Sequence, residues 1–359
     1  MVAHIRDYSV KRMRWLDERA FGEGIALAQS IPGATAMQLA AYVGLRTRGT
    51  VGALLAYVGF GLPAFVLMLS LALFYERTRN SSQIISLFSG LQVIVVALVV
   101  HALVSFGKDS VKSYREFSVS ALSAALFWSG ASPFLVIIAA ALTGAVLFSN
   151  AGAAHPPESS GAQDEPILKH ITLLLSLLLA GLLTLYFAHA ELFQLALVML
   201  KIDLFAFGGG FASLPLMLHE VVNVHGWMDH RTFMDGVALG QVTPGPIVIT
   251  ATFVGYLTYG LAGAVVATTA IFTPSLVLLI GVSPLFDRLK TSVHFLKASK
   301  GIVASFVGLL FSVAVKFMLS VPWDAMRAAI GIAALIALLK NVDVLYIVLI
   351  GAIISVVML

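Results

Sequence analysis

The sequence predicts an all-α integral membrane protein: a polytopic helical bundle of two homologous repeats, each with a helix broken at Pro-Gly. Three observations lead to this prediction. Hydrophobic residues make up 59% of the 359 residues, and the mean hydropathy is +0.97. Charged residues make up 11%, against about 25% in soluble proteins. The phrase ALAQSIPGAT at 26–35 also recurs as ALGQVTPGPI at 238–247.

Long apolar runs predict the individual membrane helices. Most of them reach or approach the roughly 20 residues that cross a bilayer, whereas a membrane β-barrel shows alternating segments of about 10 residues. The runs are 50–75, 84–107, 131–148, 171–188, 192–207, 260–283, 301–319 and 328–358. Counting shorter and interrupted segments, we expect roughly ten to twelve membrane helices.

The basic residues gather in the short loops between these runs, which fits the loop-charge rule for membrane orientation. The net charge of +4 therefore does not indicate nucleic acid binding, and the partner that we expect from the apolar composition is the lipid bilayer. The chain contains no cysteine, so no disulfide or thiolate metal site is available.

Two copies of one unit account for most of the chain. At an offset of 212 residues, and of 211 after one single-residue gap, identical residues align throughout both copies. The pairs include Trp15/Trp227, Asp17/Asp229, Phe21/Phe233, Gly24/Gly236, Gln29/Gln241, Gly44/Gly255, Pro63/Pro274 and Gly90/Gly301. We therefore divide the chain into an N-terminal repeat at 1–148, a polar linker at 149–166 and a C-terminal repeat at 167–359.

Duplicated membrane halves are typical of secondary transporters, which bind substrate between the repeats near the bilayer midplane. The loop charges leave open whether the copies are inverted or parallel. Met1 aligns with Ser213, so the segment at 190–212 has no counterpart in the first copy. We expect the chain as given to begin inside its own first repeat.

The two Pro-Gly breaks are the first candidates for the substrate site. A helix that restarts at Pro-Gly presents free N–H groups and the positive end of its dipole, which together favour an anion. The alternative is a proline kink that serves close helix packing. The candidate substrate-binding residues at these breaks are Gln29, Pro32 and Gly33 in the first copy, and Gln241, Thr243, Pro244, Gly245 and Pro246 in the second.

A glycine triplet, Gly208, Gly209 and Gly210, ends one apolar run and begins the next. Glycine permits positive φ and a bare backbone, so successive N–H groups there can form a nest that holds an anion. The alternative is a tight helix crossing or a plain turn, because small residues serve close packing in membranes.

Four charged residues are candidates for balancing the substrate's charge or for carrying a coupling ion, because an ionisable group inside a membrane segment is rare and is first considered as a functional residue. Lys201 can balance part of an anion's charge, and Asp203 can carry a coupling proton. Glu220 and Glu23 are further titratable candidates. The alternatives are a lysine that extends to the interface, and acids that cap short helices or lie at the surface.

Motifs for other chemistry are missing from the sequence. It contains no Gly-x4-Gly-Lys-Ser/Thr phosphate loop and no HExxH metal motif. We therefore predict no enzyme activity, no cofactor, no metal site and no catalytic residues. An ion gradient or the membrane potential is the expected driving force.

The repeated signatures resemble the chromate ion transporter (CHR) family in its long, two-domain form. The residues that carry the resemblance are WLDERAFGEGIALAQSIPGATAMQLAAYVGLRTRG, FAFGGGFASLPLM, HGWMDHRTFMDGVALGQVTPGPIVITATFVGY and FTPSLVLL. The resemblance covers most of the chain and is weakest through 108–190. Two departures are Ala34, where the second copy has Pro246, and the absence of the family's N-terminal Phe-Gly-Gly-Pro signature, of which Val2–Ile5 looks like the tail.

The resemblance implies a multi-pass protein of the bacterial inner membrane that exports chromate from the cytoplasm, with sulfate as a close analogue. The implied substrate-binding positions are the Pro-Gly and glycine residues named above. One alternative is a carrier for sulfate or another oxyanion, and another is a membrane subunit or sensor that does not transport. The coupling ion and a homo-oligomeric state stay open.

Overall fold

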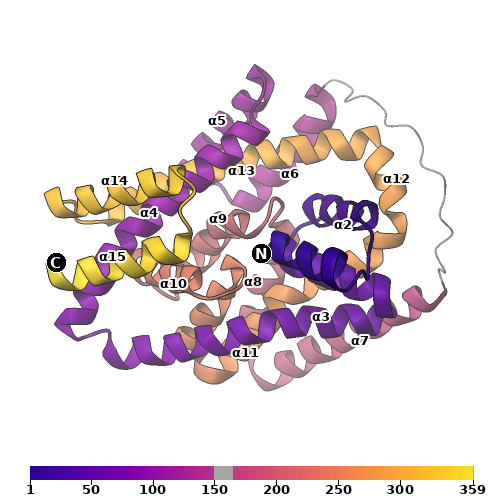
Figure 1. Cartoon of the computed structure of the whole chain (residues 1–359), viewed down its shortest axis with the longest axis horizontal. Coiled ribbons are helices and arrows are strands. Elements are labelled where there is room, and N and C mark those ends of the chain that lie inside the picture. The colour runs from indigo at the N-terminus through magenta and orange to yellow at the C-terminus, as the bar shows by residue number, and fades with distance from the viewer. Residues whose placement is uncertain (149–164, 359) are drawn as a thin grey trace.

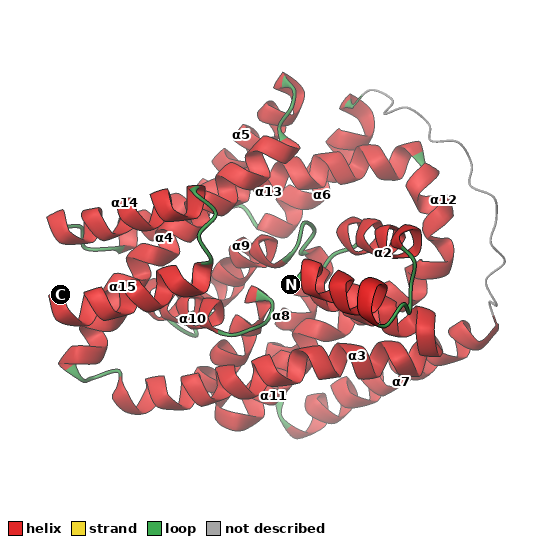
Figure 2. Ribbon diagram, in the orientation of Figure 1, coloured by secondary structure: helices red, strands yellow, loops and turns green. Residues whose placement is uncertain are grey.

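The computed structural model describes residues 1–148 and 165–358, and the described residues form helices and no strand (Figure 2). All of the predicted linker at 149–166 except its last two residues lies outside the described residues. The elements are α1 (Val2–Arg6), η1 (Asp7–Arg12), α2 (Glu18–Ser30), α3 (Thr35–Thr78), α4 (Ser82–Ser110), α5 (Tyr114–Trp128), α6 (Pro133–Leu147), α7 (Glu165–Ala188), α8 (Ala190–Phe205), η2 (Gly210–Ala212), α9 (Ser213–Met217), η3 (Leu218–Val224), α10 (His230–Val242), η4 (Ile247–Ile249), α11 (Thr250–Val282), η5 (Ser283–Leu285), α12 (Phe286–Thr291), α13 (Val293–Ser320), α14 (Ala325–Leu339) and α15 (Val344–Met358).

Five helical segments among the described residues are long and apolar enough to cross a membrane. They are Thr35–Thr78, Ser82–Ser110, Lys169–Ala188, Ile247–Leu285 and Val293–Ser320. Three shorter apolar helices are α6, α14 and α15. The apolar run at 328–358 is two helices rather than one, because a turn that contains Lys340, Asn341 and Asp343 separates α14 from α15. The all-α polytopic membrane fold is thus confirmed.

The first Pro-Gly break reverses the chain. A Cβ placed on Gly24 of α2 would overlap the ring of Tyr42 in α3, so these two helices pack antiparallel on either side of the break. The second break behaves in the same way, because a Cβ on Gly236 of α10 would overlap the ring of Phe253 in α11. Each break is therefore the tip of a helical hairpin, and not a kink within one continuous helix.

A second reversal occurs inside α3 at Arg48 and Gly49, where Gly49 has φ 65° and ψ −157°. Residues 35–47 and 50–78 are two arms that run side by side, since Gly44 touches the carbonyl of Gly52. In α11 the same turn lies at Tyr259 and Gly260, and across it the hydroxyls of Thr252 and Thr268 are 2.7 Å apart.

A third hairpin joins α8 to α9 and η3 through the glycine triplet. The Lys201 ammonium donates to Glu220 Oε1 at 2.8 Å, and the side chains of Gln194 and His225 lie 3.3 Å apart. Both pairs are nearly symmetric about residue 210, so the two arms of this hairpin also run antiparallel.

The two halves share local geometry at matching positions. Asp17 and Asp229 both have φ −82° and ψ 171°, and each carboxylate accepts the N–H of the residue three positions later at 2.7 Å, which caps α2 and α10. The bounds of α5 and α14, and of α6 and α15, differ by 211 residues. These coincidences support the prediction of two repeats.

The last two helices of each half pack on the other half. α5 and α6 pack on α13 of the second half, while α14 and α15 pack on α4 of the first half (Figure 1). Small residues permit these contacts, because a Cβ on Gly301 would overlap the carbonyl of Ala140. The short helices α8, α9 and α10 lie in the middle of Figure 1, between α3 and α13.

Candidate functional site

Three hairpin tips meet inside the protein: the first tip (residues 31–34), the glycine tip (residues 206–212) and the second tip (residues 243–246). The Gly33 N–H donates to Ala206 O at 3.0 Å, which joins the first tip to the glycine tip. A Cβ on Gly209 would lie 3.5 Å from Thr35 Oγ1, and one on Gly210 would lie 2.7 Å from Ile247 Cγ2. The glycine tip therefore touches the start of α3 and the start of η4.

Each Pro-Gly tip also packs on the long arm of the opposite half, which is 50–78 in α3 and 261–282 in α11. A Cβ on Gly33 would overlap the Ser275 side chain, and a Cβ on Gly245 would lie 2.6 Å from Ala64 Cβ. Ser275 follows Pro274 in α11, and Ala64 follows Pro63 in α3. The two contacts occupy equivalent positions of the repeat, so the tips are held in a reciprocal arrangement.

A buried polar cluster surrounds the first tip. Gln38 donates from Nε2 to Pro32 O at 2.5 Å, and the Ser275 N–H donates to Asp203 Oδ2 at 2.8 Å. The hydroxyls of Tyr57 and Ser275 lie 2.7 Å apart. Proline lacks an N–H and disturbs the helix ladder, so the backbone next to Pro274 is free to bind Asp203.

The second tip borders a cavity of about 510 Å³. Gln241, Thr243, Pro244 and Gly245 line it from the tip, and the turn between α14 and α15 lines it from the other side. Thr243 is buried, and its hydroxyl donates to Gly240 O at 2.8 Å. At the first tip, by contrast, Pro32 and Gly33 are buried and Gln29 is exposed on α2. The two tips therefore differ in access.

The meeting point of the tips has the chemistry of an anion site. Helical segments begin next to the tips at Thr35 of α3 and at Ile247 of η4, which continues into α11, and the first N–H groups of such a segment lack partners within it. Gly208 and Gly209 have φ of 96° and 93°, which few residues other than glycine adopt. Backbone N–H groups and the Thr35 hydroxyl can replace an anion's hydration without a buried positive side chain.

The predicted charged residues fall into three different places. Lys201 does not act alone, because its ammonium pairs with the buried Glu220 and lies 3.8 Å from the centre of the Phe134 ring. Asp203 faces α11 in the cluster at the first tip. Glu23 has a 40% exposed side chain and lies 3.5 Å from Arg19, so it belongs to a surface ion pair.

Three polar residues of the candidate site were not identified from the sequence. Gln38, Ser275 and Tyr57 belong to the cluster at the first tip. The sequence could have indicated Ser275 because it follows the aligned Pro274, and Gln38 and Tyr57 because they are polar residues within apolar runs. Asp235 of α10 is buried and accepts from Gln92 Nε2 at 2.8 Å and from Tyr75 OH at 2.9 Å. Both donors belong to the first half, so this carboxylate ties the second hairpin to the other repeat.

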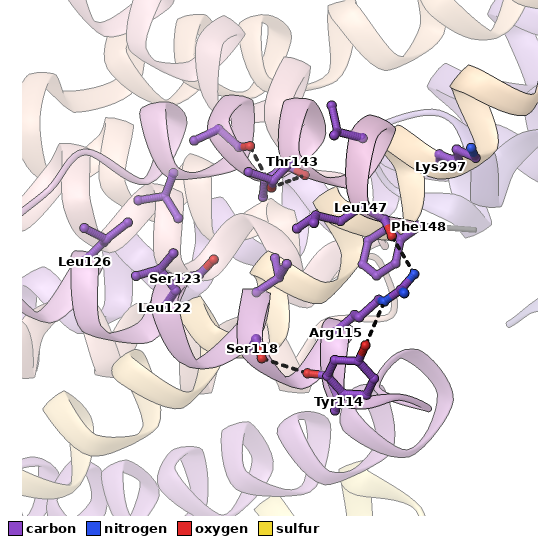
Figure 3. A pocket seen from close by; sticks show the side chains of 15 residues that line it. Tyr114, Arg115, Ser118, Leu122, Ser123, Leu126, Thr143, Leu147, Phe148 and Lys297 are labelled. Carbon is purple, nitrogen blue, oxygen red and sulfur yellow. Dashed lines mark hydrogen bonds between the residues drawn. The ribbon is translucent and has the colours of Figure 1, made fainter. Parts of the chain in front are cut away.

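Among the cavities other than the one at the second tip, two are lined in part by basic side chains. One, of about 830 Å³, is lined mainly by apolar residues of α5 and α6, with Arg115 and Lys297 at one end (Figure 3). There Arg115 donates to Leu147 O at 2.8 Å. The other, of about 550 Å³, is lined by His219, His230 and Lys316 among other residues. It gives the second half a basic recess.

Comparison with known proteins decides the family. A family model described as chromate transporter matches residues 1–145 and 193–356, so it covers both halves. The chain belongs to the chromate transporter family. The curated chromate transport protein of Cupriavidus metallidurans is 30% identical over 319 aligned positions, in a match that covers 84% of this chain and 73% of that protein. The predicted family is therefore confirmed.

Other relatives agree with this assignment. The chromate transport protein of Pseudomonas aeruginosa is 30% identical over 323 residues, 85% of this chain and 73% of the relative. An uncharacterized transporter of Methanocaldococcus jannaschii is 40% identical over 359 residues, 99% of this chain and 88% of the relative. No solved structure matches this chromate transporter family member.

Proposed function

We propose that this protein is a secondary transporter that exports chromate from the cytoplasm and binds it where the three hairpin tips meet. The contact of the glycine tip with the first tip, and with Ile247 directly after the second tip, carries this proposal. Chromate is a tetrahedral dianion, and helix N-termini with hydroxyl donors suit such a ligand. The family and its named chromate transport proteins supply the substrate.

The driving force is the membrane potential, alone or with an ion gradient. Moving one charge across the bilayer changes the free energy by about 2.3 kcal/mol per 100 mV. The exit of a dianion from a negative interior therefore gains about 4.6 kcal/mol per 100 mV. The location follows from this role and is the inner membrane of a bacterial cell.

Opposite orientation of the two halves supports alternating access. This orientation follows if each hairpin enters and leaves on the same membrane face. The long arm of α3, α4 and α7 then cross the membrane once each. The pair α5 and α6 crosses it an even number of times in total and does not change the direction. The long arm of α11 then crosses in the direction opposite to that of α3. Inverted halves that rock about a central site are a common transporter plan.

The experiment compares two Leu variants in everted membrane vesicles. Gly245→Leu drives a side chain into Ala64, 2.6 Å from the position of its Cβ, and displaces the second tip. Gly59→Leu lies on α3 with open space around it and is the matched control. We expect Gly245→Leu to abolish uptake of labelled chromate at normal expression, while Gly59→Leu retains it.

Normal uptake by Gly245→Leu would contradict the proposed site. Excess sulfate added to the same assay tests the substrate. In the same vesicles, uptake of labelled sulfate without uptake of labelled chromate would identify a sulfate carrier, the nearest alternative within the same chemistry.

A further inference from the structure

We propose that a monovalent cation, Na⁺, binds between Asp203 and Gln38 at the first tip. Among the described side chains, the buried nitrogen and oxygen atoms without a hydrogen-bond partner are Gln38 Oε1 and Asp203 Oδ1. Both are oxygens that only accept hydrogen bonds, and Asp203 and Gln38 are 1% and 0% exposed. Buried polar atoms in folded proteins normally have partners, so this pair indicates a missing ligand.

The two unpartnered oxygens belong to one cluster. A Cβ placed on Gly33 would lie 2.9 Å from Gln38 Nε2 and 3.0 Å from Ser275 Oγ, so Gln38 and Ser275 flank the same glycine. The backbone N–H of Ser275 in turn donates to Asp203 Oδ2. The first tip therefore brings the carboxylate of α8 and the amide of α3 to the same place.

The buried Asp203 carboxylate needs a positively charged occupant beside it. No lysine, arginine or histidine of the described residues pairs with Asp203, and an ionised carboxylate buried without a partner is costly. A proton on Asp203 Oδ1 that is donated to Gln38 Oε1 is the competing occupant, and the comparison of NaCl with choline chloride separates it from Na⁺. A single cation neutralises the carboxylate and satisfies both oxygens at once.

The surroundings suit a small, singly charged ion. Hard cations prefer carboxylate, amide, hydroxyl and carbonyl oxygens. Tyr57 OH and Ser275 Oγ lie 2.7 Å apart, and both also contact Phe272 O, so further oxygens are present in the same cluster. No group of three acidic, histidine or cysteine residues that could hold a metal ion occurs among the described residues. One carboxylate therefore balances one positive charge.

Asp235 provides an internal contrast. It is also buried, but its Oδ1 accepts from Gln92 and its Oδ2 accepts from Tyr75. A buried carboxylate in this fold can therefore have partners for both of its oxygens. Of these two acids, only Asp203 has an oxygen that an added ligand would satisfy.

The cation site has a consequence for the anion, and this step rests on the proposed function. An ionised Asp203 beside the first tip repels an anion bound at the start of α3, and Na⁺ removes that repulsion. Coupling of this kind is reciprocal and has typical factors of about 5 to 150. Na⁺ is therefore expected to strengthen oxyanion binding, and the oxyanion to strengthen Na⁺ binding, by the same factor.

The test measures the melting temperature of the purified full chain in detergent, with NaCl, KCl or choline chloride at equal ionic strength. At about 100 times its dissociation constant, Na⁺ should raise the melting temperature by about 5 °C relative to choline. Asp203→Asn, which keeps an acceptor for the Ser275 N–H, and Gln38→Met should each lose the Na⁺ effect. Asp235→Asn, the matched control, should retain it.

An equal melting temperature in NaCl and choline chloride for the unmodified protein would overturn the proposal, and so would a full Na⁺ effect in Asp203→Asn. Because no oxyanion is present, this result is independent of chromate transport. A Na⁺ effect without chromate uptake in vesicles would uphold the cation site and reject the proposed function. Chromate uptake in a protein without any Na⁺ effect would do the reverse.

Discussion

The glycine tip gives the sharpest prediction, because Gly209→Ala adds one methyl group where space exists but the backbone conformation does not suit it. Gly209 has φ 93° and ψ −169°, a region that is nearly exclusive to glycine. The new Cβ would lie 3.5 Å from Thr35 Oγ1, an ordinary contact. The strain is therefore the main effect, at about 1–3 kcal/mol.

This strain should act on the population of the tip conformation that binds substrate. At about 1.4 kcal/mol per factor of ten, chromate uptake in everted vesicles should fall about 5- to 150-fold. Gly130→Ala is the matched control, because Gly130 also has φ 93° but lies in the turn between α5 and α6, where it borders the basic recess and not the tips and has nothing within 4 Å of its Cβ position. Gly130→Ala should lose comparable thermal stability and keep its uptake.

Two results would refute this reasoning. If Gly209→Ala transported chromate at the unmodified rate, the glycine tip would not form part of the substrate site. If both variants lost uptake to the same extent, loss of stability alone would explain the effect, and the tip would have no special role.

Three further predictions concern packing and charge. Tyr75→Phe removes one donor from the buried Asp235 carboxylate and should lower the free energy of unfolding by about 1–3 kcal/mol, measured by denaturation in detergent; an unchanged value would contradict the assigned hydrogen bond. Gly44→Leu places a side chain on the carbonyl of Gly52 and should prevent accumulation of folded protein in the membrane, whereas normal accumulation on a membrane immunoblot would contradict the reversal within α3. Lys316→Gln removes a cation from the basic recess and should weaken the apparent chromate affinity in vesicle uptake about 3- to 10-fold, less at high salt, and an effect independent of salt would argue against electrostatic attraction.

The sequence predicts the places where the chain breaks but not the direction it takes there. Gly33 and Gly245 were identified as candidates from the repeated Pro-Gly phrase, and Gly209 was identified from the glycine triplet. Whether a Pro-Gly break kinks a helix or reverses it depends on packing across the break, such as Gly24 against Tyr42. The alignment of the two copies contains Gly24, Gly33 and Gly245 but does not show which side chains they contact.

The cluster at the first tip was beyond prediction for a related reason. Asp203 was singled out because a charge in an apolar helix is unusual, but its partner Ser275 is 72 positions away and Tyr57 is 146 positions away. A small polar residue in an apolar run is common in membrane helices, where it often serves packing. Only the tertiary contact between Gly33 and Ser275 distinguishes this serine from the others.

The most direct test of the central claim is energised uptake of labelled chromate by everted vesicles that contain this chain, compared with vesicles from cells carrying the empty vector. Uptake above the empty-vector level, reduced by Gly245→Leu and not by Gly59→Leu, is the predicted result. Uptake equal to the empty-vector level despite verified membrane expression, or uptake that is insensitive to Gly245→Leu, would contradict a chromate site at the three hairpin tips.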